Sequence, residues 1–166
     1  MSFSLTPQYS FQELTDITPA FLERLGIRFL MLDLDNTLAA YAERLPSDRI
    51  ARWADDMKIH GIVLYIVSNS RRKGRVSAFA EALKIGAVMR ARKPSRKGVH
   101  RAISAAGFSE DNSAFVGDQV YTDTLAANRA GVISIIVKPR HNTNPILAFR
   151  YALEAPFRAA CKNKIK

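Results

Sequence analysis

Asp33-Leu34-Asp35-Asn36-Thr37-Leu38 directly follows an apolar run, residues 27–32, that predicts a buried strand. Two carboxylates at the end of a buried strand are costly to place there without a partner. A divalent cation or a phosphoryl group would supply that partner. The alternative interpretation is a plain turn rich in Asp and Asn, so the other strand ends must decide between them.

Length and composition indicate one globular domain. The chain has 166 residues, of which 48% are hydrophobic, and this is enough to bury a sizeable core. The single cysteine, Cys161, excludes an intrachain disulfide and a cysteine metal cluster and favours a reducing compartment. The start has no secretory pattern and no apolar run is long enough to cross a bilayer, so we expect a cytoplasmic protein.

Within the single domain 1–166, we expect a lead-in (1–26), a catalytic core (27–140) and a basic C-terminal helix (141–166). Apolar runs predict strands at 27–32, 62–67, 86–88, 113–116 and 132–137. Amphipathic stretches predict helices at 18–26, 47–61, 70–84, 95–106, 122–130 and 145–162, the last disturbed at Pro156. Continuous apolar strands alternating with helices indicate an α/β fold with a five-stranded, mainly parallel sheet covered on both faces.

Polar residues follow four of the predicted strands. Asp33 and Asp35 follow the first, Ser68-Asn69 the second, Lys93-Pro94 the third, and Gly117-Asp118 the fourth, with Asp123 five residues later. In a parallel sheet these positions share one rim, where ligands bind. Each group alone is explicable as a helix cap, a loop lysine or a turn, but their coincidence favours a site.

These groups can perform phosphoryl transfer. One carboxylate can attack phosphorus and form an aspartyl phosphate, while a second acid protonates the leaving oxygen and then activates water. Mg²⁺ held by carboxylates offsets the charge on the phosphoryl oxygens, and a lysine and a hydroxyl complete the cradle.

The motifs resemble those of the haloacid-dehalogenase (HAD) superfamily of phosphatases. Asp33-Leu34-Asp35-Asn36-Thr37 matches the first motif, Asp-x-Asp-x-Thr, and Ser68 matches the second. Lys93 matches the third, and Gly117-Asp118 through Thr122-Asp123 matches the fourth. The resemblance implies a three-layer Rossmann-like core.

The resemblance also implies roles for individual residues. Asp33 would be the nucleophile and Asp35 the general acid/base. Mg²⁺ would be held by the Asp33 carboxylate, the Asp35 backbone carbonyl and Asp118. The phosphoryl group would be bound by Thr37, Ser68, Asn69 and Lys93, with Gly117 and Asp123 in support. Lys97 is a second candidate for the motif lysine.

A finer resemblance is to the YqeG group, whose eukaryotic relatives include phosphatidylglycerophosphate phosphatases. It rests on Leu25-Gly26-Ile27, the Asp33–Leu38 stretch, Val67-Ser68-Asn69-Ser70, Ala91-Arg92-Lys93-Pro94 and Gly117–Asp123.

The basic stretches and the spacing between the motifs indicate which class of substrate the site would accept. The stretch 71–101 holds 11 Lys and Arg against one Glu, and 138–166 holds seven against one Glu. The intervals between motifs are too short for a large cap domain, which predicts an open site. We expect a phosphorylated, large or surface-bound anionic substrate such as phosphatidylglycerophosphate. In the predicted last helix, Phe149, Leu153 and Phe157 share a face flanked by Arg150, Arg158 and Lys162. This face either packs on the sheet or makes peripheral contact with an anionic membrane.

Other functions stay open. A small-metabolite or nucleic-acid phosphatase would also use these motifs, although the basic stretch has few aromatic residues on which bases could stack, so nucleic acid is less favoured. A receiver domain would not need Asp35, and a dehalogenase would need neither Asp35 as an acid nor Asp118 as a ligand. A non-catalytic phosphate-binding module would not need every catalytic position to be filled.

Overall fold

Strands and helices alternate along the chain as the apolar runs predict. The computed structural model describes residues 4–140 and 145–165. Its elements, in chain order, are β1 (Tyr9–Ser10), η1 (Leu14–Asp16), α1 (Pro19–Arg24), β2 (Phe29–Leu32), α2 (Asp48–Ile59), β3 (Val63–Val67), α3 (Lys73–Leu83), β4 (Gly86–Val88), α4 (Lys97–Ala106), η2 (Glu110–Asn112), β5 (Ser113–Gly117), η3 (Val120–Thr124), α5 (Leu125–Ala130), β6 (Ile133–Ile136), α6 (Pro145–Ala159) and β7 (Asn163–Lys164).

The strands form one sheet in the order β4-β3-β2-β5-β6-β1-β7, and every pair in it is parallel. The α/β class and the parallel sheet are therefore confirmed, but the strand number is seven and not five. The two extra strands, β1 and β7, have two residues each. Segments that short have no hydrophobic periodicity, so the sequence pattern does not reveal them.

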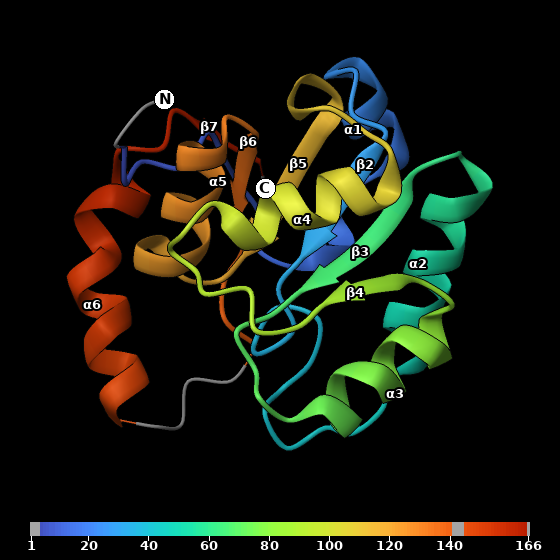
Figure 1. The fold of residues 1–166 in the computed structure, drawn as a ribbon. Helices are drawn as coiled ribbons and strands as arrows, with labels where there is room; N and C mark the ends of the chain where they lie inside the picture. The colour runs from blue at the N-terminus through green and yellow to red at the C-terminus, as the bar shows by residue number, and fades with distance from the viewer. Residues whose placement is uncertain (1–3, 141–144, 166) are drawn as a thin grey trace.

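Helices cover both faces of the sheet (Figure 1). Alternate side chains of β2 point to opposite faces, and each face has its own apolar cluster. Leu30 and Leu32 pack with residues of α1, α2 and α3. Phe29 and Met31 pack with residues of α4 and α5. The predicted three-layer arrangement is thus present, and α6 runs along the edge of the molecule near β7 (Figure 1).

Two helices on the first face begin where their capping residues predict. The hydroxyl of Thr18 accepts a hydrogen bond from Phe21 N at 3.2 Å, and Pro19 occupies the first turn of α1. Ser47 caps α2 in the same way. The last helix continues through Pro156 and ends at Ala159, three residues before the predicted end.

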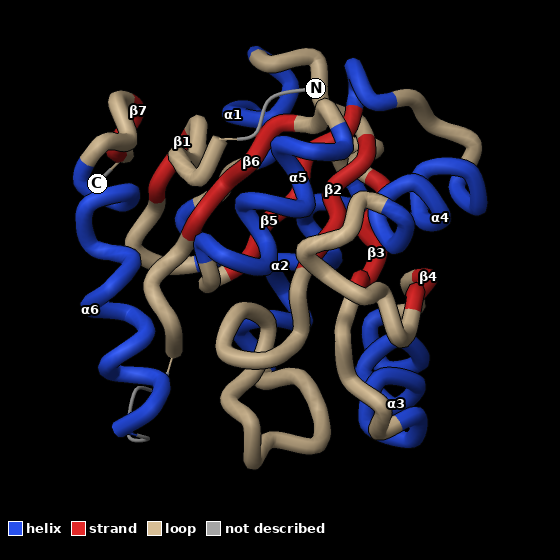
Figure 2. Tube along the Cα trace, turned by 60° about the vertical axis from the view of Figure 1, so that its left-hand side comes forward, coloured by secondary structure: helices blue, strands red, loops and turns tan. Residues whose placement is uncertain are grey.

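The loops that follow the strands gather at one end of the sheet, at the bottom of Figure 2. The segment between β2 and α2 is a loop without a helix or strand of its own, and the described part of the chain contains no large cap over this end. Within residues 4–140 and 145–165, no helix combines the length and the apolar character needed to cross a membrane.

Candidate active site

Strand register brings the predicted site residues to one rim. Leu32, the last residue of β2, pairs with Ile66 of β3 and with Val116 of β5. Asp33 extends the ladder by one more bond, from its backbone N–H to Val116 O at 2.9 Å. Because β2 lies between β3 and β5 in the sheet, the Asp33 carboxylate lies between the loops that carry Ser68 and Asp118.

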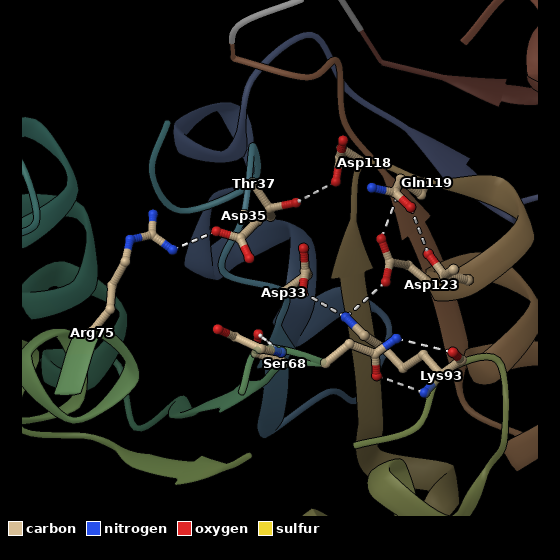
Figure 3. Close-up of polar contacts among 12 residues, drawn as sticks. Asp33, Asp35, Thr37, Ser68, Arg75, Lys93, Asp118, Gln119 and Asp123 are labelled. Atoms are coloured by element: carbon tan, nitrogen blue, oxygen red, sulfur yellow. Dashed lines mark hydrogen bonds and ion pairs between the residues drawn. The ribbon is translucent and has the colours of Figure 1, made fainter. Parts of the chain in front are cut away.

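Lys93 lies at the centre of the site (Figure 3). Its Nζ is 2.5 Å from Asp33 Oδ1 and 2.8 Å from Asp123 Oδ1, and its side chain is only 2% exposed. Burial lowers the pKa of Lys93, but the charges of Asp123 and Asp33 outweigh burial and raise it well above its usual value. Lys97 lies exposed at the start of α4, so Lys93 is the lysine that faces the acids.

Three buried carboxylates surround this ammonium group. Oxygen atoms of Asp33, Asp118 and Asp123 lie within 4.8 Å of one another. The Thr37 hydroxyl donates to Asp118 Oδ1 at 3.4 Å, and Asp123 Oδ2 accepts from Gln119 N at 3.1 Å.

The cluster fits a divalent cation. Burial raises the pKa of Asp33 to about 7, against the attraction of Lys93. Burial, followed by repulsion from Asp123 and Asp33, raises the pKa of Asp118 well above its usual value. If all three acids ionise, they exceed Lys93 by two negative charges in a buried site. Carboxylate oxygens and an excess of negative charge favour a hard divalent cation such as Mg²⁺.

Ser68 and Asn69 lie beside Lys93 on the loop that follows β3. Ser68 is buried, and its Oγ accepts from Ser70 N at 3.0 Å. The Asn69 side chain accepts from Lys93 N at 2.7 Å and donates to Lys93 O at 2.9 Å. Asn69 therefore holds the backbone that carries the lysine.

Asp35 is paired through one oxygen with Arg75, a residue that the motifs do not indicate. The Arg75 guanidinium donates to Asp35 Oδ1 (Figure 3). It also donates to Ala40 O at 2.9 Å and to Glu43 O at 2.8 Å. One side chain of α3 thus fixes the acid and the loop after it. The basic stretch draws attention to Arg75, but nothing in the sequence links it to an acid 40 residues away.

Asn36 gives that loop its turn. Its φ is 62°, a left-handed conformation that Asn tolerates better than most residues. Its N–H donates to Ala39 O at 2.8 Å, and Ala39 N returns a bond to Leu34 O at 3.1 Å. This compact turn begins the loop that Arg75 holds at Ala40 and Glu43.

The last helix also contacts the site, and this too is not evident from the motifs. The Arg158 guanidinium donates to Asp118 O, to Val137 O and to Glu154 Oε2, and Glu154 is 1% exposed. The sequence predicts Arg158 at the edge of the apolar face of this helix, and its guanidinium points to the segments that follow β5 and β6. The Glu–Arg spacing of four residues is a signal for this pair, but it does not reveal the backbone carbonyls that Arg158 binds.

Gly117 leaves the space that Asp123 occupies. A Cβ at this position would overlap Cβ, Cγ and Oδ2 of Asp123. We expect Gly117→Ala to push Asp123 away from Lys93, lowering kcat/KM and destabilising the fold by about 1–3 kcal/mol. Urea unfolding and phosphatase assays measure the two effects.

Gly74→Ala is the matched control, since nothing lies within 4 Å of a Cβ there and Gly74 is inside α3. It should leave activity unchanged and stabilise the protein by about 0.5–1 kcal/mol. If Gly117→Ala behaves like this control, the close approach of Asp123 to Gly117 matters neither for activity nor for stability.

Comparison with known proteins identifies the family. The HAD-hydrolase-like family model matches residues 90–146. The chain is 34% identical over 149 residues to the probable phosphatase YqeG of Bacillus subtilis (strain 168), and the match covers 89% of this chain and 86% of that protein.

Solved structures share the fold at low identity. The cobalt-bound deoxy-D-mannose-octulosonate 8-phosphate phosphatase YrbI of Haemophilus influenzae is 16% identical, with a TM-score of 0.57 over 83% of this chain and 91% of that one. The Moraxella catarrhalis 3-deoxy-D-manno-octulosonate 8-phosphate phosphatase, solved with magnesium, phosphate and its sugar, is 16% identical, with a TM-score of 0.55 over 81% and 89%. Together with the sequence matches, these neighbours show that the chain belongs to the HAD superfamily of phosphatases, in its YqeG-like group.

Proposed function

We propose that the protein is a Mg²⁺-dependent phosphomonoester hydrolase that works through an aspartyl phosphate on Asp33. The observation that carries the proposal is the buried cluster in which Lys93 bridges Asp33 and Asp123, with Asp118 within reach. The carboxylate of Asp33 is held in place by Lys93, and Ser68 and Lys93 are the donors that we propose for the phosphoryl oxygens.

Asp33 and Asp35 both act in each half of the reaction, the formation and the hydrolysis of the aspartyl phosphate. In the first, an Asp33 oxygen bonds to phosphorus, the bond from phosphorus to the ester oxygen breaks, and that oxygen takes a proton from Asp35. In the second, Asp35 accepts a proton from water, whose oxygen bonds to phosphorus as the bond to Asp33 breaks. Oδ1 of Asp35 is occupied by Arg75, which leaves Oδ2 for these proton transfers.

The metal, when bound, would offset charge on the phosphoryl oxygens. Asp33, Asp118 and the backbone carbonyl of Asp35 are the ligands we propose, with Asp123 holding Lys93. The test is hydrolysis of p-nitrophenyl phosphate with Mg²⁺ or with EDTA, beside Asp33→Asn. The proposal fails if the wild type shows no Mg²⁺-dependent turnover above that variant on this ester or on lipid, sugar and nucleotide monophosphates.

Magnesium affinity should rise with pH. The pKa of Asp33 is about 7 and that of Asp118 is also raised, both chiefly by burial, so protons compete with the metal below neutral pH. We expect affinity to fall by roughly tenfold for each pH unit below 7 from the Asp33 proton alone, and more steeply with Asp118. Calorimetric titration at pH 6 and pH 8 measures this. Asp33→Asn should flatten the dependence, and an affinity equal at both pH values would refute it.

An open, basic site suits a large or surface-bound anionic substrate, and phosphatidylglycerophosphate is the example we propose. Support comes from the absence of a large cap and from the basic stretch 71–101, which encloses Lys93. A cytoplasmic location with peripheral membrane contact fits such a substrate.

The membrane contact would be made by α6. Phe149 and Leu153 of this helix are 67% and 50% exposed, and 138–166 carries a strong positive charge. Phe157, expected on the same face, instead packs against Tyr121. At low salt we expect tighter binding to anionic than to neutral liposomes, and a several-fold loss of that binding in the double variant Phe149→Ser, Leu153→Ser. Equal binding to both liposome types would count against the contact.

A further inference from the structure

We propose that Arg71, Arg90 and Arg92 form a second anion-binding subsite beside the catalytic cluster, which selects phosphomonoesters that carry another phosphate or phosphodiester group. This inference rests on the proposed function and names the substrate class for it. The three side chains and Asn69 line a groove of about 480 Å³, ample for a phosphate group.

The two segments that carry these arginines are tied to each other and to the catalytic residues. Ser68 N donates to Val88 O and Ala91 N donates to Ser68 O, each at 3.0 Å. The side-chain amide of Asn69 binds both the backbone N–H and the backbone C=O of Lys93. Figure 1 shows the loops that follow β3 and β4 side by side. Ser68 and Lys93 are buried, whereas the neighbouring arginines are exposed.

The loop after β4 is fixed in place. Ala91 is buried and packs against Gly98, where a Cβ would come within 2.6 Å of Ala91 Cβ and O. Arg101 donates to Met89 O at 3.0 Å and to Arg90 O at 3.2 Å. Because the backbone of this loop is already held in place, an anion that binds there does not have to order it, which favours binding.

Two of the arginines adopt a backbone conformation that Asn or Gly would adopt with less strain. Arg90 and Arg92 have φ values of 49° and 59°, a left-handed conformation that is unfavourable for an ordinary L-residue. Strain of this kind gathers at functional sites. Within residues 4–140 and 145–165, the three guanidinium groups of the groove make no hydrogen bond or ion pair. Three unpaired cations in one groove are complementary to an anion.

The test compares soluble esters that differ in a second anionic group. The probes are glycerophosphoglycerol phosphate, which adds a phosphodiester, propane-1,3-diol bisphosphate, which adds a phosphate, and glycerol 3-phosphate, which adds neither. We expect kcat/KM for glycerophosphoglycerol phosphate or for propane-1,3-diol bisphosphate to be at least about tenfold higher than for glycerol 3-phosphate. A preference for the diester indicates a lipid headgroup, and one for the bisphosphate indicates a soluble metabolite; both support the subsite.

The variant Arg90→Asn, Arg92→Asn removes the charges and keeps residues suited to left-handed φ. It should abolish the preference while kcat/KM for p-nitrophenyl phosphate stays within about twofold. Arg90→Lys, Arg92→Lys should retain part of the preference, and Arg52→Gln, an exposed arginine of α2, should retain all of it. No preference in the wild type, or one that survives the Asn substitutions, overturns the subsite.

Binding to Asp33→Asn separates this inference from the proposed function. Titration of that variant with glycerophosphoglycerol phosphate and with glycerol 3-phosphate should show the same preference, and the Asn substitutions should remove it. If hydrolysis fails on every ester while the binding preference holds, the subsite stands and the catalytic proposal falls.

Discussion

Asp33→Asn is expected to lower kcat for p-nitrophenyl phosphate by at least about 10⁴-fold, because an amide cannot serve as the nucleophile that the carboxylate provides. The variant should keep its fold, since the amide oxygen can still accept a hydrogen bond from Lys93 Nζ, which lies 2.5 Å from Asp33 Oδ1. Asp111→Asn, at an exposed acid of η2, is the control and should leave activity unchanged.

The same substitution should stabilise the metal-free protein at alkaline pH. The pKa of Asp33 is raised by burial from 3.8 to about 7, so its ionisation destabilises the fold increasingly between those values. At pH 8 we expect Asn to gain a few kcal/mol in EDTA, with a smaller gain at pH 5 or with Mg²⁺. Urea unfolding measures this. If the variant is instead less stable under every condition, its loss of activity has a structural cause.

Lys93→Met is expected to destabilise the metal-free protein by about 3–5 kcal/mol, because it leaves the buried acids without their cation. Activity should fall by at least about 10²-fold, since Nζ no longer positions Asp33 or binds the phosphoryl group. Urea unfolding in EDTA and in Mg²⁺ measures the first effect, and Mg²⁺ should restore part of the lost stability.

Two further variants test the interpretation of Lys93. Lys97→Met changes an exposed lysine four residues away and should behave like the wild type. Adding Asp123→Asn to Lys93→Met should recover part of the stability, because one of the two acids that contact Nζ is then neutral. If Lys97→Met and Lys93→Met lose activity equally, Lys93 is not the only lysine that the reaction requires.

The sequence predicts the sheet and the position of its polar rim because both follow from local patterns. Apolar runs end at Asp33, Ser68 and Asp118, and parallel pairing then brings these ends together. The choice between Lys93 and Lys97 does not follow from such patterns. This choice depends on the path of a loop in which Arg90 and Arg92 adopt left-handed φ. An arginine in the sequence does not predict that conformation.

Contacts between distant segments also escape the sequence. Arg75 meets Asp35 across 40 residues, and Arg158 meets the Asp118 carbonyl across the same separation. Arg75 binds two backbone carbonyls of one loop, and Arg158 binds the carbonyls of Asp118 and Val137, which follow β5 and β6. The paths of these segments are fixed only by tertiary packing. The seven-stranded sheet has the same origin, since β1 and β7 are strands only because they pair.

The place of β1 constrains how the chain folds as it leaves the ribosome. Tyr9 pairs with Ile135 of β6 and with Asn163 of β7, so this early strand has no partner until most of the chain has been made. Phe11 and Leu14 are buried in the folded protein. Until β6 has been synthesised, some of the residues that pack against them are missing. We expect a stalled nascent chain that ends before β6 to expose them and to bind chaperones that recognise apolar segments.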